Sequence, residues 1–495
     1  MILKVKSLKL LAGRPVAILH ANTAKKLAIY PGERISIKKH PKSQKIIAIV
    51  DIAKGMLKEN EAALSSEIIN YLKLKERDKI EVSAAPKLLS IYYILEKLKG
   101  KTLDYQKIYG IITDIVNNAL TEAEIAYFVS AIFINGMTID ETAMLIKAMV
   151  ENGKKLDIKN VVDKHSIGGI AGNRTTPIIV SICSSTGLVM PKTSSRAITS
   201  AAGTADVMEV LTKVEFTSEE IKKIVKKTNA CLVWGGALGL APADDKIIQV
   251  ERLISLDPEA QLIASILSKK LAVNAKYVLL DIPYGKSAKA SSKEDAIRLA
   301  RKFENLAKFF GLKLKTVLTD GSEPIGNGIG PVLEARDVIS VLSRSKDRPL
   351  DLEKKALDLS AIILEMTGKA KKGEGLNLAK KILDSKLAYK KFMEIINAQN
   401  GSIKNLKNRL ISAKFNFKLK AKKNSSVMDI DNKKIAAVAR AAGCPADKPA
   451  GIYLYVHRGF KVKKDDNLAT VYAETKEKLN FAVDLFKKIN PIVLK

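Results

Sequence analysis

Short apolar runs separated by turn residues dominate the first 85 residues of the chain. The runs ILKVKSLKLL, RPVAILH and KIIAIVDI are rich in β-branched and aliphatic residues, and stretches such as YPGER and KHPKS interrupt them. Short runs bounded by turn residues are typical of β-strands. We therefore predict a small N-terminal β domain over residues 1–85.

The spacing of apolar residues becomes helical between Lys87 and Met149. Thr121 opens the segment TEAE, whose threonine and second glutamate have the spacing of a capping box. A second helix start falls at Thr138 or Asp140. These signals predict an all-α domain over residues 86–155, to which residues 240–272 return.

Strand-like and helical segments alternate after about residue 156. The strand-like runs include NVVD, GLVM, ACLVWG and YVLLDI, and the helical segments include TTPIIVSICSST and SKEDAIRLARKFENLAKFF. Such alternation implies a mostly parallel sheet with right-handed crossovers. We predict an α/β domain over residues 156–239 and 273–411. Short strands and one helix, Lys433–Ala442, then predict a C-terminal α+β domain over residues 412–495, which makes the fold class multidomain α/β.

The composition is that of a globular protein with several domains, since the chain has 495 residues of which 47% are hydrophobic. No run of about eighteen apolar residues is present, and charges interrupt the N-terminal segment MILKVKSLKLL. The cysteines Cys183, Cys231 and Cys444 are too far apart for a zinc site or a disulfide framework. We expect a cytoplasmic protein with no bound metal and no membrane contact.

The net charge of +32 raises the question of a nucleic-acid partner. Residues 161–210 are nearly neutral, with four basic and three acidic side chains, whereas residues 379–424 carry thirteen Lys or Arg and two Asp or Glu. This basic strip is either a solvated, lysine-rich face or a surface for RNA or another polyanion, with Phe415 and Phe417 as stacking groups. Because aromatic residues make up only 5% of the chain, we do not expect nucleic acid to be the main partner.

The stretch VDKHSIGGIAGNRTTP, residues 162–177, places a lysine, a histidine and a serine directly ahead of a glycine-rich loop. It joins a predicted strand to a predicted helix, at the carboxyl end of the strand, where ligands bind in open α/β sheets. Glycines allow a close approach of the backbone, and helix N-termini favour anions. The spacing does not match a Walker loop. The stretch by itself indicates either an anion site or a plain turn.

A second loop, PKTSSRAITSAAGTAD at residues 191–206, also follows a predicted strand and is rich in short hydroxyl side chains. Its candidate donors are Ser194, Ser195, Thr199, Ser200 and Thr204. Two loops that leave the same sheet edge converge in space, as a phosphate pocket requires.

The segment RLISLDPEAQLIASILSKKLA, residues 252–272, contains the third group of candidates. Asp257 followed by Pro258 is a good helix start, in which the carboxylate caps the helix and the proline takes its first position. Ser265 and Lys269 are four residues apart and share one helix face. They form either a polar stripe or a solvated edge.

The segments KHSIGGIAGN, SSRAITSAAGTADVMEV, LAPADDKI and ASILSKK together resemble the thymidine/pyrimidine-nucleoside phosphorylase family over roughly residues 90–495. The resemblance implies an all-α domain packed across a cleft from an α/β domain, followed by a C-terminal α+β domain. It also implies a homodimer that uses neither a metal nor an organic cofactor. The additional N-terminal β domain is similar to the archaeal branch of the family, whose members act on AMP and form larger homo-oligomers.

The resemblance implies a reaction in which inorganic phosphate, the co-substrate, attacks C1′ of a bound nucleoside or nucleotide while the base leaves. The implied phosphate-binding residues are Lys164, Ser166, Gly168, Thr176, Ser194 and Thr204. The implied nucleotide-binding residues are Gly169, Ser195, Arg196, Ala197, Ile198, Thr199, Ser200, Thr204, Ser265, Lys269 and Lys289. Two catalytic residues are implied: His165 faces the base, and Asp257 is the proton donor of the AMP branch.

One departure from the family pattern bears on the substrate. Pyrimidine enzymes of the family hold the base with an arginine, and Val250 stands at that position here, while Ser265 and Lys269 of the same clamp are retained. Lys289 replaces an apolar base-pocket residue, and its charge suits a 5′-phosphate. AMP, CMP and UMP are therefore the expected substrates. A thymidine or uridine phosphorylase and an RNA-binding protein on a phosphorylase scaffold are the two alternatives.

Overall fold

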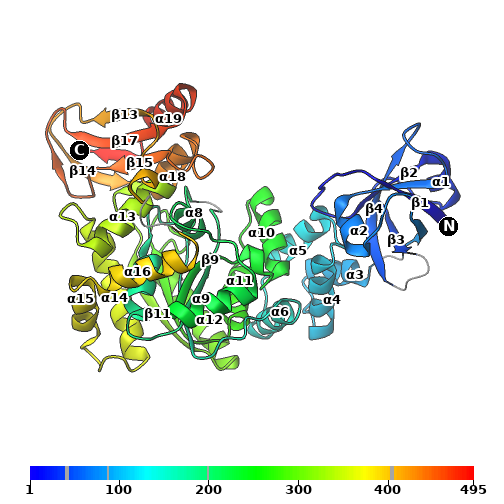
Figure 1. Cartoon of the computed structure of the whole chain (residues 1–495), viewed down its shortest axis with the longest axis horizontal. Coiled ribbons are helices and arrows are strands. Elements are labelled where there is room, and N and C mark those ends of the chain that lie inside the picture. Colours follow the sequence, from blue (N-terminus) through cyan, green and yellow to red (C-terminus); the bar gives the residue numbers. More distant parts are fainter. Residues whose placement is uncertain (40–43, 86–87, 198–199, 402–405) are drawn as a thin grey trace. The chain divides into compact units, whose positions relative to one another are not determined.

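The computed structural model describes residues 1–39, 44–85, 88–197, 200–401 and 406–495, and Figure 1 labels their helices and strands. Contacts divide the chain into two compact units. The first unit comprises Met1–Asn152 and Pro242–Ala264, and the second comprises Gly153–Ala241 and Ser265–Lys495. Among these residues, no helix has both the length and the apolar character that a membrane crossing requires.

A closed six-stranded β-barrel forms the start of the first unit, in the strand order β1-β5-β2-β4-β3-β6. Closure removes free sheet edges, and the alternate residues of β1 and β3 point into an apolar core. The predicted β domain is confirmed, although β5 was not among the predicted runs. The strands are β1 Ile2–Ser7, β2 Val16–His20, β3 Arg34–Lys39, β4 Lys45–Ala53, β5 Glu61–Leu64 and β6 Lys79–Ala84, and the helices are α1 Ala21–Lys26 and α2 Ser66–Leu72.

Among the described residues, five helices and the first part of α11, up to Ala264, complete the first unit. The sequence signals at two of the helix starts are confirmed. Thr121 and Glu124 form a capping box at α5, and Thr138 with Glu141 forms another at α6. Of the two candidates for the second start, Thr138 is therefore the cap. The helices are α3 Leu89–Leu98, α4 Tyr105–Val116, α5 Glu122–Asn135, α6 Ile139–Glu151 and α10 Pro242–Ile254.

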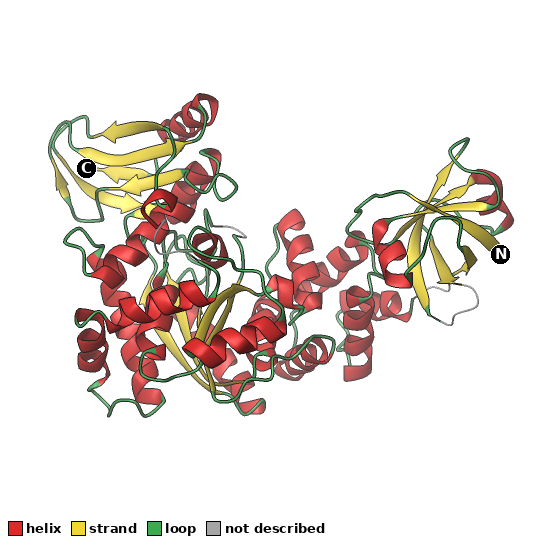
Figure 2. Cartoon of the chain, viewed as in Figure 1, coloured by secondary structure: helices red, strands yellow, loops and turns green. Residues whose placement is uncertain are grey.

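Parallel strands surrounded by helices form the main part of the second unit (Figure 2). β11, β10 and β7 pair in that order, β8 pairs with β9, and a bridge between Val161 and Val189 connects the two sets. Every pairing is parallel, as predicted. The strands are β7 Val161–Ser166, β8 Met190–Ser194, β9 Ala230–Trp234, β10 Ala275–Tyr284 and β11 Lys313–Asp320.

The helices of this part include α7, all of whose residues are buried. Helices α13, α14 and α16 contact α7, so the helix that follows the glycine-rich loop is enclosed by the core. The helices are α7 Thr175–Ser184, α8 Thr204–Glu209, α9 Ser218–Thr228, the short 3₁₀ helix η1 Gly236–Leu238, α11 Glu259–Ala272, α12 Lys293–Phe309, α13 Pro331–Ser343, α14 Leu350–Met366, α15 Gly375–Asp384, α16 Leu387–Ala398 and α17 Leu406–Arg409.

Two small sheets and two helices form the C-terminal part of the second unit. One sheet has the order β12-β15-β17-β13 and the other β16-β14-β18. The sequence predicted one helix, but α19 also forms, because its buried positions Leu479, Ala482, Val483 and Phe486 have helical spacing. The elements are β12 Gly328–Ile329, β13 Phe415–Lys420, β14 Ser425–Ile430, α18 Asn432–Ala441, β15 Gly451–Leu454, β16 Lys461–Val462, β17 Asn467–Ala473, α19 Lys476–Ile489 and β18 Ile492–Leu494.

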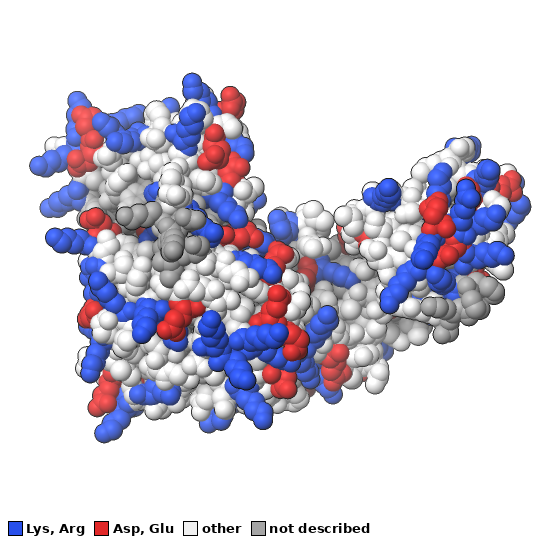
Figure 3. Space-filling view, in the orientation of Figure 1, with Lys and Arg blue, Asp and Glu red and all other residues white. Residues whose placement is uncertain are grey.

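Lysine and arginine are spread over the face shown in Figure 3, with acidic residues among them. Two aromatic rings of the basic strip lie beside lysines. The ammonium of Lys487, from outside the strip, lies 5.6 Å from the centre of the Phe417 ring, and that of Lys414 lies 5.6 Å from the centre of the Phe415 ring. Cations of the chain itself therefore cover one face of each ring, which lessens the value of these rings for stacking on bases.

Candidate active site

Lys164, near the carboxyl end of β7, is the centre of the predicted phosphate site. Its side chain is 0% exposed, which is rare for lysine. The ammonium group donates to the hydroxyls of Ser166 at 2.5 Å, Thr175 at 2.9 Å and Thr176 at 3.5 Å. We call these four residues the lysine–hydroxyl cage. The sequence predicted Lys164, Ser166 and Thr176; it missed Thr175, although the adjacent Thr176 marked the place.

The strands reach further into this site than the sequence indicated. β7 extends through Lys164, His165 and Ser166, which were predicted to follow the strand, and β8 likewise ends at Ser194. Thr175 and Thr176 open helix α7, so the helix N-terminus adds its dipole to the cage. The cage is thus held by strand ends and a helix start, which are more rigid than a loop.

The charge of Lys164 responds to pH near neutrality. Burial lowers the pKa of the Lys164 ammonium to about 7; Asp281 acts to raise this pKa, whereas the cations of Lys355, Lys192 and Arg174 lower it. An anion entering the cage would favour the protonated form. The cage is therefore suited to an anionic ligand.

Asp281, on β10, lies beside the cage and was not predicted. It accepts hydrogen bonds from Ser166 Oγ at 2.6 Å and Thr319 Oγ1 at 2.5 Å, and Lys355 Nζ lies 3.1 Å from its Oδ2. Burial would raise the pKa of Asp281, but Lys355 and Lys164 outweigh burial and hold it below its usual range. In the sequence, the signal that could have identified Asp281 was a single carboxylate within the apolar run YVLLDI.

Asp163 forms a second buried ion cluster next to the cage. Its carboxylate lies 2.6 Å from Lys270 Nζ and 3.3 Å from Lys192 Nζ, and it accepts a hydrogen bond from the Lys164 backbone N–H at 2.7 Å. Burial lowers the pKa of Lys270 to about 7. Burial, and then the cations of Lys270 and Lys192, also hold the pKa of His165 well below its usual range. The His165 imidazole is therefore neutral.

Arg174 connects the two loops that the sequence predicted to converge. Its guanidinium donates to Thr204 Oγ1 at 2.9 Å, to the Ala202 carbonyl at 2.8 Å and to Glu334 at 2.5 Å. Thr204 is therefore joined to the glycine-rich loop through Arg174, which the sequence reading did not single out. Asp206 fixes the second loop from within, because it accepts the backbone N–H groups of Ala197 at 2.7 Å and Gly203 at 2.8 Å.

Arg196, which the resemblance implies as a nucleotide contact, lies among acidic side chains of its own unit. Its guanidinium donates to both oxygens of Glu209, at 2.7 and 3.0 Å, and to Glu215 at 3.0 Å. It also lies 4.9 Å from the centre of the Trp234 ring. These contacts anchor the second loop at Arg196. Ser200 donates to the Ala202 carbonyl at 2.9 Å, Ser195 is exposed, and Ile198 and Thr199 lie outside the described residues.

Gly169 is the position in the glycine-rich loop where the backbone requires glycine. Its φ of +110° is one that side chains rarely adopt, and a Cβ there would lie 3.3 Å from Lys289 N and 3.4 Å from Ala288 Cα. The loop that carries Lys289 thus packs directly against the glycine-rich loop. Gly168 differs, since a Cβ at that position would meet nothing within 4 Å.

Gly169→Ala is expected to destabilise the protein by about 1–3 kcal/mol, because the added methyl group strains the backbone. It should also weaken phosphate binding, since the loop next to the cage must shift. Thermal unfolding and the KM for phosphate measure the two effects. Gly110→Ala is the control and should change neither, because Gly110 lies in α4 and a Cβ there would meet the Tyr93 ring at an ordinary 3.6 Å. Equal effects of the two substitutions would contradict a special role for Gly169.

The remaining predicted residues lie on α11 and nearby. α11 begins at Glu259, and the Pro258 carbonyl accepts the N–H of Leu262, so Asp257 stands one residue ahead of the helix cap rather than at it. Asp257 is exposed and belongs to the first unit, whereas Ser265 and Lys269 belong to the second. Val250, at the position of the missing arginine, is buried in α10.

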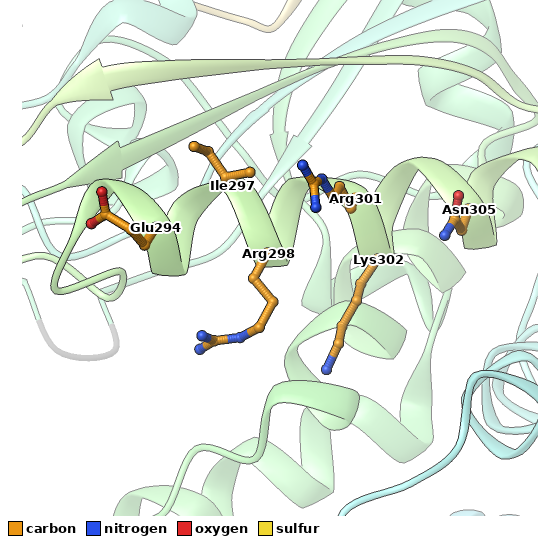
Figure 4. A pocket seen from close by; sticks show the side chains of 6 residues that line it. All are labelled: Glu294, Ile297, Arg298, Arg301, Lys302 and Asn305. Carbon is orange, nitrogen blue, oxygen red and sulfur yellow. The ribbon is translucent and has the colours of Figure 1, made fainter.

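A hollow of about 350 Å³ lies elsewhere, along the outer face of α12 (Figure 4). Its lining comes from one helix and none of the predicted site residues contributes to it. The lining residues are Glu294, Ile297, Arg298, Arg301, Lys302 and Asn305. Because these positions recur every three or four residues, the hollow follows one helical stripe.

Three segments of the chain match known domain families. Residues 91–153 match the family described as "Glycosyl transferase family, helical bundle domain", and residues 158–385 match "Glycosyl transferase family, a/b domain". Residues 426–493 match "Pyrimidine nucleoside phosphorylase C-terminal domain".

Several curated proteins are similar over nearly the whole chain. The AMP phosphorylase of Pyrococcus horikoshii is 44% identical over 491 residues, which cover 99% of this chain and 97% of that protein. The AMP phosphorylase of Thermococcus kodakarensis is 42% identical with the same coverage. A protein of Legionella pneumophila (strain Corby), provisionally named thymidine phosphorylase, is 43% identical over 91% of this chain and 86% of its own length.

Solved structures with lower identity share the fold. Anthranilate phosphoribosyltransferase from Thermus thermophilus superposes with a TM-score of 0.52 at 16% identity, over 62% of this chain and 99% of that chain. The enzyme from Saccharomyces cerevisiae, solved with PRPP and Mg, gives the same TM-score at 15% identity, over 64% of this chain and 99% of that chain.

Proposed function

This chain belongs to the thymidine/pyrimidine-nucleoside phosphorylase family, and we propose that its own reaction is the phosphorolysis of AMP to adenine and ribose 1,5-bisphosphate. CMP and UMP are further substrates in this proposal. The observation that carries it is the similarity to AMP phosphorylases over 99% of the chain, which includes the N-terminal barrel. The buried lysine–hydroxyl cage at the carboxyl edge of the sheet supports phosphate as the second substrate.

The reaction replaces one bond at C1′ of the ribose by another. A phosphate oxygen forms a bond to C1′ while the bond from C1′ to the base nitrogen breaks, and the electron pair of that bond goes to the base. Such a displacement passes through an oxocarbenium-like state. Lys164, Ser166 and Thr176 hold the phosphate, and Ser194 and Thr204 close the same site from the second loop.

Departure of the base needs a proton, and we assign Asp257 as its donor. His165 faces the base in this proposal, and because its imidazole is neutral, it contributes a hydrogen bond without adding a positive charge beside Lys164. Inorganic phosphate is the co-substrate, and no metal or organic cofactor takes part; activity should therefore persist in EDTA.

A product assay tests the function directly. Purified protein is incubated with phosphate and, separately, with AMP, CMP, adenosine and thymidine, and free base and sugar phosphate are quantified. We expect release from AMP and CMP but little from the nucleosides. Release of base from thymidine, with little from AMP and CMP, would instead identify a pyrimidine nucleoside phosphorylase. The retained Ser265 and Lys269 favour this alternative.

Lys289 is the residue that we assign to the 5′-phosphate of the substrate. Lys289→Met is expected to raise the KM for AMP about tenfold, since a hydrogen bond to a charged group contributes about 1.5 kcal/mol or more. Adenosine, which lacks that phosphate, should react at the same slow rate in both proteins. Lys286→Met, an exposed lysine in the same loop, is the matched control. An unchanged KM for AMP in Lys289→Met would remove Lys289 from the substrate site.

We propose that the protein works in the cytoplasm as a homodimer that assembles further. The three cysteines are buried free thiols, which suits a reducing compartment. Exposed apolar side chains on the first unit, such as Tyr127, Phe133 and Ile134, offer surface for self-association. Light scattering measures the mass, and a monomer at working concentration would contradict the assembly.

A further inference from the structure

Asp281 and Lys355 form a buried pair beside the cage, and the predicted phosphate contacts include neither of them. Asp281 is 0% exposed and lies in the middle of the sheet on β10. Lys355 reaches it from α14, with 3.1 Å between Lys355 Nζ and Asp281 Oδ2. Thr319, on the neighbouring strand β11, donates to the other carboxylate oxygen at 2.5 Å. Together with Ser166, which donates to Oδ2 at 2.6 Å, these groups hold the carboxylate from three directions.

The hydroxyl of Ser166 connects this pair to the cage. Ser166 Oγ accepts from Lys164 Nζ at 2.5 Å and donates to Asp281 Oδ2 at 2.6 Å. A hydroxyl has one proton, so the proton of Ser166 points toward Asp281 and its lone pairs toward Lys164. Asp281 thereby fixes the direction of Ser166 and stabilises a positive charge on Lys164 at the same time.

We propose that Asp281, held by Lys355 and Thr319, is a positioning residue that sets the charge of Lys164 and the direction of the Ser166 hydroxyl in the phosphate site. The inference rests on the proposed function, since it assigns the cage to inorganic phosphate. Asp281 itself does not touch the phosphate, because an anion would be repelled by its carboxylate. Lys355 limits the effect, as its own charge opposes a second positive charge nearby.

Other charged groups around Lys164 come from separate elements and are themselves paired. Lys192 on β8 is paired with Asp163, and Arg174 ahead of α7 is paired with Glu334. In the ion pair of Asp281 with Lys355, by contrast, the carboxylate shares the Ser166 hydroxyl with the lysine of the cage. Substitutions in this pair should consequently change the protonation of Lys164 with opposite signs.

The direction of each pH shift follows from the charge that the substitution removes. Phosphate binds the protonated ammonium, so its affinity falls as the pH rises through the pKa of Lys164, which is about 7 in the free protein. Asp281→Asn removes a negative charge and lowers that pKa, which moves the fall in affinity to more acidic pH. Lys355→Met removes a positive charge and moves it to more alkaline pH. Each shift is expected to be about one pH unit.

The experiment measures phosphate affinity as a function of pH for the full-length parent, Asp281→Asn and Lys355→Met. Isothermal titration calorimetry with inorganic phosphate gives Kd between pH 5.5 and 9, and initial rates with AMP give the KM for phosphate. The ionisation of phosphate itself is common to all three proteins and cancels in the comparison. Lys354→Met, an exposed lysine on the same helix, is the matched control and should leave the profile unchanged.

Opposite shifts of the two variants would support the positioning role. Shifts in the same direction, or equal loss of affinity at every pH, would overturn it, because a merely structural role lowers affinity without moving the profile. If Asp281→Asn fails to fold, Lys355→Met alone tests the proposal: an alkaline shift of its affinity profile supports the positioning role, and an unshifted profile overturns it. Failure of the proposed function is distinguishable, since the parent would then bind phosphate without cleaving AMP, and a parent that binds no phosphate would overturn both.

Discussion

Lys164→Met should reduce kcat/KM for phosphate by about 10²–10³-fold, the range expected when a buried donor to a reacting anion is removed. The cage is built around the Lys164 ammonium, and the hydroxyls of Ser166, Thr175 and Thr176 converge on it. The substitution therefore removes the positive charge that attracts phosphate and the group that organises the donors around it.

The fold should tolerate this change. Asp281 keeps its ion pair with Lys355 and its hydrogen bonds from Ser166 and Thr319, so no buried carboxylate is left uncompensated. Met has a similar volume and removes a desolvated charge, so the melting temperature should stay within a few degrees of the parent.

Initial rates of AMP cleavage at increasing phosphate concentration measure the effect of Lys164→Met. The control is Lys159→Met, an exposed lysine just ahead of the same strand, which should retain the parent rate. A Lys164→Met protein that kept its KM and kcat within about threefold would show that phosphate binds elsewhere, because a lost charge contact should cost at least 1.5 kcal/mol, about tenfold.

The cage illustrates what the sequence could and could not predict. Lys164, Ser166 and Thr176 were implied by the family resemblance, and the glycine-rich segment between a strand and a helix indicated an anion site or a turn at the same place. Asp281 and Lys355 were not, because their proximity depends on how β10 and α14 pack, more than a hundred residues away along the chain. Their local patterns, a carboxylate in an apolar strand and a lysine in an amphipathic helix, are compatible with many arrangements.

The second loop shows the opposite limitation. Its small hydroxyl residues correctly indicated convergence on the first loop, since Arg174 joins Thr204 and Ala202 to the start of α7. The composition could not show that Arg196 forms ion pairs with Glu209 and Glu215, because ion pairs of this kind form only in the folded loop. At the fold level, strand alternation predicted the parallel sheet. β5 was missed because two of its four residues are alanine, which is depleted in strands. α19 was missed although its buried positions have helical spacing.

Asp257→Asn should lower kcat for AMP by about 10²–10⁴-fold, the range for loss of a general acid. Asparagine has a similar shape and can accept hydrogen bonds, but it has no acidic proton to give to the departing adenine. α11 begins two residues later, at Glu259, and the Pro258 carbonyl accepts the N–H of Leu262 in its first turn. The KM for phosphate should change little, because the cage residues are untouched.

Two comparisons separate proton donation from a structural role of Asp257. Glu259→Gln neutralises a neighbouring carboxylate in the first turn of α11 and should retain most activity. A nucleotide with a methylated, cationic purine, such as 7-methylguanosine 5′-monophosphate, releases its base in the neutral form. Its cleavage therefore needs no added proton. If this substrate is cleaved by the parent, Asp257→Asn should cleave it at a similar rate. Equal losses with AMP and the cationic nucleotide would instead assign Asp257 to substrate binding, and full activity with AMP accompanied by a stability loss of about 1 kcal/mol would assign it to helix capping.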